Sequence, residues 1–173
     1  MLVQPADGEH RSIAEAMGAF TRWADYPLMV VTVGSPDGEI SGCLAGFVTQ
    51  RSIQPPRFLV CVSKVNHTYF VAERVTGIAL HLLGADQTDL ASLFGEQTGD
   101  TFDKFEHCHW RPRATGAPVL SDCAAWLEGL IISRSSVGDH QALLIRPQAG
   151  GSGSHSGLLT LKTAPKFQPG RPA

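Results

Sequence analysis

The sequence of 173 residues lacks the signs of several large protein classes. No run of about 18 or more apolar residues occurs, so we expect no membrane-spanning helix. The 14 Lys and Arg nearly balance the 16 Asp and Glu, which gives a formal net charge of −2 without a basic stripe. We therefore expect no binding to nucleic acid or to an anionic membrane surface. Residues 1–11 are polar and acidic, unlike a signal peptide, and we expect a cytoplasmic protein.

Cysteine and histidine patterns argue against disulfides and metal sites. The four cysteines lie far apart and form no CxxC pair: Cys43, Cys61, Cys108 and Cys123. A disulfide framework is not expected in a cytosolic chain of this size. His107 and His109 could face one side of an extended segment, but a metal site normally takes three or four protein ligands. No matching Cys/His cluster is visible elsewhere, so we expect no metal ion.

Nucleotide-binding and hydrolase signatures are also missing. The chain has neither a P-loop nor a Gly-x-Ser-x-Gly motif. The Gly-Gly-Ser-Gly stretch at 150–153 leads into Ser-His-Ser-Gly and not into a helix, so it is no dinucleotide fingerprint. A Rossmann sheet is not expected either, because strand and helix signals do not alternate regularly along the chain.

What is present is the composition of one globular domain, with 43% hydrophobic and 17% charged residues. We expect its core at about residues 12–147, followed by a linker, an edge strand and a mobile tail within 148–173. Ser12 and Glu15 form a capping box that predicts a helix ending near Asp25. Its apolar residues recur at helical spacing and are expected to face the core: Ile13, Met17, Phe20 and Ala24.

Short apolar and β-branched runs, separated by turn residues, predict about seven strands. We expect them at 28–33, 40–50, 58–62, 77–83, 124–133, 137–146 and, at the edge, 158–162. Pro147 is expected to end pairing, with 148–157 as a linker. Two further helices are expected, one capped by Ser63 or Asn66 and running to about Val75, the other capped by Asp86 and stopped by Gly95. Hairpins and long connections dominate, which favours a closed or half-closed antiparallel barrel with peripheral helices.

Four pieces of sequence, in their order and spacing, resemble the flavin reductase-like, FMN-binding family over roughly residues 13–145. They are Gly42–Val62, the Ser-Lys-Val-Asn-His-Thr segment at 63–68, the pieces between Asp103 and Glu128, and Gly138-Asp-His140. The resemblance implies a mainly β, Greek-key-like, antiparallel split barrel that forms a homodimer with FMN, or FAD, at the dimer interface. It also implies reduction of the flavin by NADH or NADPH, and a flavin-dependent monooxygenase as a partner that consumes the reduced flavin.

The resemblance places one strand along the flavin ring, and its cofactor-binding residues would be Ala45, Gly46, Phe47, Val48, Thr49 and Gln50. The missing side chain of Gly46 would let a planar ring approach the backbone. The alternative is that small residues relieve crowding where a barrel strand bends. Many members carry Thr-Ala-Ser-Ser-Phe where this chain has Leu-Ala-Gly-Phe-Val at 44–48, so flavin affinity or the hold on the ring could differ.

A helix start after the strand at 58–62 suits the flavin phosphate, as the family places it. The residues concerned are Ser63, Lys64, Asn66 and Thr68. Unpaired N–H groups and a partial positive charge at a helix N-terminus favour an anion there. The alternative is an ordinary asparagine cap beside an exposed lysine.

Two further segments are assigned by the resemblance. His140, in the Gly-Asp-His stretch, would lie close to the flavin and the nicotinamide as the catalytic residue. The alternative is a hairpin turn that precedes a structural histidine. Lys104 and Phe105, after Asp103, would contact flavin or nicotinamide as part of a lid. The alternative there is a surface ion pair beside a buried phenylalanine.

The sequence leaves three functions open. The first is an NAD(P)H-dependent flavin reductase. The second is a non-catalytic flavin-binding protein, since hydroxyls are lost at 44–50 and Leu158–Lys162 replaces the tyrosine- and glycine-rich ending common in reductases. The third is a deazaflavin-dependent reductase on the same fold. No ribose-reading acidic residue can be assigned, so NADH and NADPH stay open.

Overall fold

The structure is a computed structural model and describes residues 12–168 and 170. Its main sheet has seven antiparallel strands in the order β2-β1-β5-β8-β9-β4-β3, and a second sheet pairs β6 with β7. The strands are β1 (Met29–Gly34), β2 (Ile40–Ala45), β3 (Val48–Ser52), β4 (Arg57–Ser63), β5 (Gly77–Leu82), β6 (Trp110–Pro112), β7 (Pro118–Leu120), β8 (Ala125–Val137) and β9 (His140–Ser152). The helices are α1 (Ile13–Thr21), α2 (His67–Ala72) and α3 (Thr88–Glu96), with a 3₁₀ turn, η1, at Lys104–His107.

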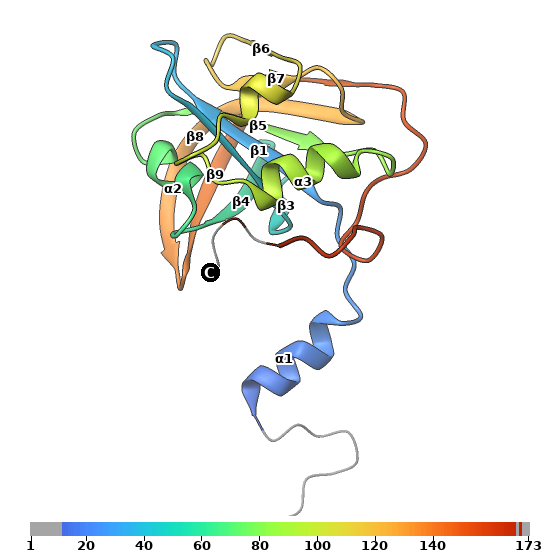
Figure 1. Ribbon diagram of the computed structural model, residues 1–173. Coiled ribbons are helices and arrows are strands. Elements are labelled where there is room, and N and C mark those ends of the chain that lie inside the picture. The colour runs from blue at the N-terminus through green and yellow to red at the C-terminus, as the bar shows by residue number, and fades with distance from the viewer. Residues whose placement is uncertain (1–11, 169, 171–173) are drawn as a thin grey trace, which may run out of the picture.

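The predicted fold class, a mainly antiparallel β domain of the split-barrel type with peripheral helices, is confirmed. Strands β2 and β3 are the two edges of the main sheet, so the sheet is not closed by hydrogen bonds. In Figure 1, α2 and α3 lie beside the strands, whereas α1 lies apart from them. Within the described residues, no helix is long and apolar enough to cross a membrane.

The stretch 40–50 does not form the single strand that we predicted. Strand β2 pairs with β1 as far as Met29↔Ala45, and β3 then pairs with β4 from Val48↔Val60 onward. The chain therefore crosses from one edge of the sheet to the other at Gly46 and Phe47. The carbonyl of Phe47 accepts a hydrogen bond of 2.9 Å from the backbone N–H of Cys61, which fixes the bend to β4.

The β8–β9 hairpin is longer than predicted, with 13 residues in each strand. Pro147 does not end the pairing, because it lies opposite Gly129 beside an irregularity in register at Glu128/Gly129. A bulge can accommodate a residue that has no N–H to donate to the ladder. Residues 148–152, predicted as linker, are therefore the last part of β9.

The C-terminal segment packs on the sheet without forming the predicted edge strand. It makes two isolated bridges, Pro27↔Thr160 and Gly84↔Leu158. Leu159 is 1% exposed and belongs to a core cluster, against which the half-buried Phe167 also packs. The core thus extends beyond the predicted boundary at 147, and the described part of the predicted mobile tail contacts it. The last residues of that tail, 169 and 171–173, lie outside the described residues.

The helices differ from prediction in their contacts more than in their positions. The capping box of Ser12 and Glu15 on α1 is confirmed, with both reciprocal hydrogen bonds present. The expectation that α1 faces the core is wrong, because none of its residues is buried. Gln87 takes the N-cap position of α3 in place of Asp86, and α3 ends at Glu96, one residue beyond the predicted stop.

Strand β1 is buried along its whole length and divides the core in two. Val31 and Val33 face the barrel interior with Val60 and Ile145, as expected for alternate residues of a strand. Val30 faces the opposite cluster, which α3 and the β6–β7 hairpin cover. The β-branched residues therefore pack on both faces of β1, which is why this run reads as continuously apolar.

His81 of β5 links these layers through a fully buried imidazole. Its Nε2 accepts a hydrogen bond from the backbone N–H of Leu120 at 3.1 Å, so the proton lies on Nδ1, which donates to the carbonyl of Val30 at 3.0 Å. Burial lowers the pKa of His81 to about 4, although the bond to Val30 opposes that shift. The ring is therefore neutral at pH 7 and acts as a structural crosslink.

Candidate functional site

Several predicted site residues converge at one end of the β4–β9 ladder. Ser63, the last residue of β4, lies directly opposite His140, the first residue of β9. The bend between β2 and β3 brings the ring of Phe47 to 5.4 Å from that of His140, at an interplanar angle of 59°. Residues far apart in sequence thus form one group because β4 pairs with β3 on one side and with β9 on the other.

The imidazole of His140 is held by its neighbour in the chain. Its Nδ1 lies 2.8 Å from the carboxylate of Asp139, and this hydrogen bond lowers the pKa of Asp139. The side chain of His140 is 21% exposed. In the part of the chain that the structure describes, Nε2 makes no hydrogen bond. The contact with Asp139 therefore fixes the ring and leaves Nε2 open to a ligand.

Ser63 carries a polar atom without a partner. Its Oγ is inaccessible to solvent and has no hydrogen-bond partner among the described residues. Buried hydroxyls in folded proteins are nearly always hydrogen-bonded, so this atom has an unused capacity for a hydrogen bond that a bound group could fill. A ligand in contact with His140 would lie next to it, because the two residues are opposite each other in the ladder.

Lys64 holds the turn that carries His140. Its Nζ donates to Ser136 Oγ and to the carbonyl of Gly138, both at 2.6 Å. Its backbone N–H donates to the carbonyl of Asp139 at 3.0 Å. Two of the three ammonium protons are therefore directed at the β8–β9 turn. In this geometry Lys64 positions His140 through the hairpin.

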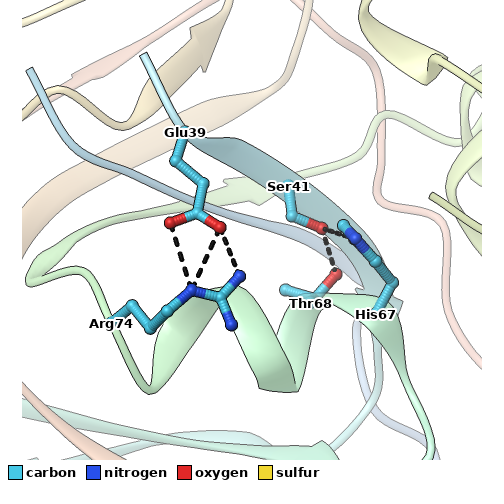
Figure 2. A network of polar contacts seen from close by, with 5 residues as sticks. All are labelled: Glu39, Ser41, His67, Thr68 and Arg74. Carbon is cyan, nitrogen blue, oxygen red and sulfur yellow. Dashed lines mark hydrogen bonds and ion pairs between the residues drawn. The ribbon is translucent and has the colours of Figure 1, made fainter. Parts of the chain in front are cut away.

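The start of α2 is bound to β2 by a buried polar network (Figure 2). The hydroxyl of Ser41 lies 3.1 Å from Thr68 Oγ1 and 3.1 Å from His67 Nδ1. Thr68 is fully buried, so its hydroxyl faces β2. Arg74, two residues after the end of the same helix, pairs with Glu39, the residue before β2, and this contact lowers the pKa of Glu39.

Asn66 is the N-cap residue of α2, but its side chain makes no capping hydrogen bond. The ordinary asparagine cap that we weighed as an alternative is thus not observed. The amide of Asn66 is half-buried beside the first turn of the helix. Ser41 and His67 are not among the predicted site residues, since a hydroxyl on a neighbouring strand gives no sequence signal of this contact.

Lys104 and Phe105 support β2 from the side of α3 and do not join the His140 group. The ammonium of Lys104, in a side chain 3% exposed, donates to the carbonyls of Gly42 at 2.9 Å and Phe94 at 3.3 Å. Burial lowers its pKa. The ring of Phe105 packs edge-on against those of Phe94 and Trp110. The alternative of a surface ion pair at Lys104 is therefore wrong, because this lysine is buried on backbone carbonyls.

Thr49 and Gln50 lie on the exposed edge strand β3. The hydroxyl of Thr49 donates to the carbonyl of Gln50, and the amide of Gln50 donates to the carbonyl of Ser52. Both side chains are accessible to a molecule that covers this edge. Ala45 is buried in the barrel core and Val48 packs against it, so these two residues can offer a ligand mainly their backbone.

The family of the chain follows from comparison with known proteins. Residues 21–163 match the family model described as Flavin reductase like domain. The chain belongs to this family. The resemblance drawn from the sequence is thereby confirmed.

Relatives of the flavin reductase like family are about 30% identical to this chain over the aligned residues. The stachydrine N-demethylase reductase subunit Stc3 of Rhizobium meliloti (strain 1021) is 30% identical over 148 residues, or 86% of this chain and 61% of that protein. An FMN reductase (NADH), RutF 1, of Methylorubrum extorquens is 30% identical over 145 residues, 79% of this chain and 71% of its own length. This chain spans 45% of a probable flavin reductase, also from Rhizobium meliloti.

A solved structure of the flavin reductase like family has the same fold. The flavin reductase domain protein of Arthrobacter sp. FB24 superposes with a TM-score of 0.78 at 27% identity, covering 91% of this chain and 96% of that one. The agreement extends over nearly the whole of both chains, so the two proteins share the fold described above.

A flavin, the cofactor that the family implies, fits the His140 group by two observations. A Cβ placed on Gly46 would meet one atom within 4 Å, Leu28 Cδ2 at 3.7 Å, so the space beside this backbone is open. Crowding at the bend therefore does not explain the glycine. The buried hydroxyl of Ser63 still requires a partner, and a flavin ring or phosphate can supply one.

A cavity away from the His140 group contains none of the predicted site residues. It measures about 530 Å³ and is lined by α3 and the segment 102–109, including His107, Cys108 and His109. The ring of His107 stacks on Phe102 at 4.7 Å. Within the described ranges, no group of three or more His, Cys, Asp or Glu is placed to hold a metal ion.

Proposed function

We propose that the chain is a flavin reductase, an enzyme that oxidises NADH and reduces FMN, with FAD as the alternative flavin. Membership of the flavin reductase like family supports this, as does similarity to a protein named FMN reductase (NADH). The observation that carries the proposal is the juxtaposition of His140, Phe47 and the unpaired hydroxyl of Ser63 beside an open backbone at Gly46.

The residues from 45 to 50 would hold the flavin ring. Gly46 presents backbone without a side chain, and Phe47, which is 59% exposed, offers an aromatic face that would exclude water from one side of a planar ligand. Thr49 and Gln50 offer polar groups on the exposed edge of β3. The bound flavin would supply the hydride-accepting chemistry, as cofactors generally do in such enzymes.

The polar residues of the site would orient the flavin and supply or accept its protons. The hydroxyl of Ser63 would donate to a flavin oxygen or nitrogen. His140 would donate or accept a proton at Nε2, next to the reacting rings, while Asp139 holds Nδ1. Lys64 would keep the Gly138–Asp139 turn in place. A flavin phosphate would be bound by the remaining ammonium N–H of Lys64, the side-chain amide of Asn66 and the first turn of α2. A bound nicotinamide would supply the hydride and solvent would supply one proton, so that NADH would leave oxidised and the flavin reduced.

The same proposal includes a homodimer and a second enzyme. The flavin site lies at an edge of the sheet and would be completed by a second copy of the chain. Similarity to the reductase subunit of stachydrine N-demethylase supports a partner, a flavin-dependent monooxygenase, that uses the reduced flavin. A cytoplasmic location belongs to the proposal as well, because it brings the enzyme together with NADH.

The role of His140 is tested by a matched pair of variants. His155 is also bonded through Nδ1 to an aspartate, Asp86, at 3.2 Å, and its side chain is similarly exposed at 18%. We expect His140→Ala to lower the rate of NADH oxidation with FMN at least about 100-fold, since acid–base groups contribute about 10²–10⁴. His155→Ala should retain the wild-type rate. Equal rates in the two variants would contradict the assignment of His140.

A further inference from the structure

Helix α1 exposes apolar side chains that none of the described residues covers. Ile13 is 81% exposed, Met17 55% and Phe20 74%, and their spacing places them on one face of the helix. Trp23, two residues after the end of the helix, is 82% exposed. Figure 1 shows α1 standing apart from the strands, with its long axis pointing away from them.

The segment after α1 holds the helix in this position. Hydrogen bonds join it to the C-terminal segment at four places: Trp23 O with Lys162 Nζ, Asp25 Oδ1 with Lys162 N, Tyr26 O with Leu161 N, and Leu28 N with Leu159 O. Arg22 alone separates the end of the helix from the first of these anchors. The helix therefore has almost no freedom to fold back and cover its apolar face on its own sheet.

A helix of this kind is not stable by itself. It has nine residues, and isolated helices shorter than about 12–15 residues are marginal in water even with good caps. In proteins most helical stability comes from packing an apolar face, and α1 has such a face without a partner in the described part of its own chain. A surface outside the described residues of this protomer must therefore cover it.

We propose that α1 is a dimerisation arm whose apolar face packs on a second copy of this chain. Large aromatic side chains bury about 150–250 Å² each, so the exposed parts of these four side chains offer roughly 500 Å². Two exchanged arms with the surfaces that they cover would bury roughly 2,000 Å², comparable with a stable interface of about 1,600 Å². A single arm docked on an unrelated protein would bury only about half of this, below the range of specific complexes.

An apolar cavity lies at the end of the sheet where the chain from α1 enters β1, and we assign it as the seat, that is, the docking site for the partner's arm. Its volume is about 210 Å³, and its lining is apolar: Met29, Phe58, Leu80, Leu82, Ala125, Trp126 and Leu127. Met29, Leu82 and Ala125 lie side by side in the ladder at the point where the chain arriving from α1 enters β1. The cavity is smaller than typical small-molecule sites and suits a single aromatic side chain.

The test compares the oligomeric state of the full chain and three variants by sedimentation velocity across a range of concentrations. We expect a dimer for wild type and a dissociation constant at least about 100-fold higher for Phe20→Glu, as for a central hot spot. Ile53→Glu is the matched control, because Ile53 is also 82% exposed but lies in the β3–β4 connection. It should remain dimeric. Ala125→Trp, which fills the cavity, should also weaken the dimer.

The outcomes separate this proposal from the proposed function. A dimer that Phe20→Glu leaves intact would overturn the arm and leave the homodimer standing, with the partner enzyme as the next candidate for the helix. A monomeric wild type would overturn both. A dimer weakened by Phe20→Glu but not by Ala125→Trp would overturn the seat. Because Phe20 is exposed in the protomer, the sheet should fold in this variant, which an unchanged urea midpoint of the monomer would verify.

Trp23 gives an independent optical signal. If the arm is covered in the dimer, dilution should shift the tryptophan emission to longer wavelength as Trp23 enters water. In Trp23→Phe this shift should become smaller without vanishing, because Trp126 lines the proposed seat and is also uncovered when the dimer dissociates. An emission that does not change across the dissociation range would contradict the proposed position of the arm.

Discussion

Acidification should destabilise the protein through His81, whose neutral imidazole crosslinks three strands. The ring donates to the carbonyl of Val30 and accepts from the N–H of Leu120, so a second ring proton would break the latter bond. Burial holds the pKa in the folded protein at about 4, against 6.5 for an ordinary histidine. Above pH 6.5 neither the folded nor the unfolded chain binds this proton, and the stability contributed by the neutral ring is fully present.

Between pH 6.5 and pH 4 the unfolded chain binds the proton and the folded chain does not, so stability falls with pH. Each pKa unit corresponds to 1.36 kcal/mol, and the difference of about 2.5 units gives a loss of roughly 3 kcal/mol. This is a large part of the free energy of unfolding of a typical domain, which is about 5–15 kcal/mol. Below pH 4 the loss levels off, because the folded protein also takes up the proton.

Urea unfolding at a series of pH values measures this effect. Other groups titrate in the same window, so the comparison is with His81→Gln, which cannot bind a proton but keeps a donor and an acceptor. The decrease in unfolding free energy from pH 7 to pH 4 should be smaller in this variant by about 3 kcal/mol. His155→Gln, at a partly exposed histidine, should follow wild type. Parallel curves for wild type and His81→Gln would refute the reasoning.

Four substitutions test other contacts. Gly77→Ala should cost about 3 kcal/mol in urea unfolding, since its Cβ would clash with the carbonyl oxygen of Thr115, whereas Gly46→Ala should cost under about 1 kcal/mol. Equal midpoints for these two variants would contradict this reasoning. Lys104→Met leaves two backbone carbonyls without a donor and should cost about 1–3 kcal/mol in the same assay, so an unchanged midpoint would show that its ammonium is dispensable. Lys64→Met should cost under about 1 kcal/mol but slow NADH oxidation about 10-fold, and a wild-type rate would show that the hairpin turn does not need it.

Local sequence patterns predicted most helices and strands well, but not which surfaces or strands they pack on or pair with. The capping box placed the start of α1 correctly, because that signal lies within four residues. The apolar face of α1 shows that something covers the helix, yet periodicity does not say whether the cover is the same chain. Pro147 was predicted to end β9, and a register irregularity opposite it, which has no local signal, allows the strand to continue.

In the candidate site, too, local segments could be predicted from the sequence, but the long-range contacts between them could not. The Gly-Asp-His stretch and the segment 45–50 could be singled out by their resemblance to a family. That Ser63 lies opposite His140 depends on the β4–β9 register, between residues far apart in sequence, and no short pattern encodes it. Lys104 was expected to contact flavin or nicotinamide as part of a lid. A lysine in sequence gives no sign that its ammonium will be buried on the carbonyls of Gly42 and Phe94.

The most direct test of the proposed function is titration of the purified protein with FMN and FAD, followed by addition of NADH. Flavin fluorescence reports binding, and absorbance at the nicotinamide band reports turnover. We expect saturable binding of FMN and NADH oxidation that depends on added flavin. Binding without oxidation would contradict a reductase and favour a flavin carrier or a deazaflavin enzyme. Failure to bind either flavin would contradict the central claim that residues 45–50, Ser63 and His140 form a flavin site.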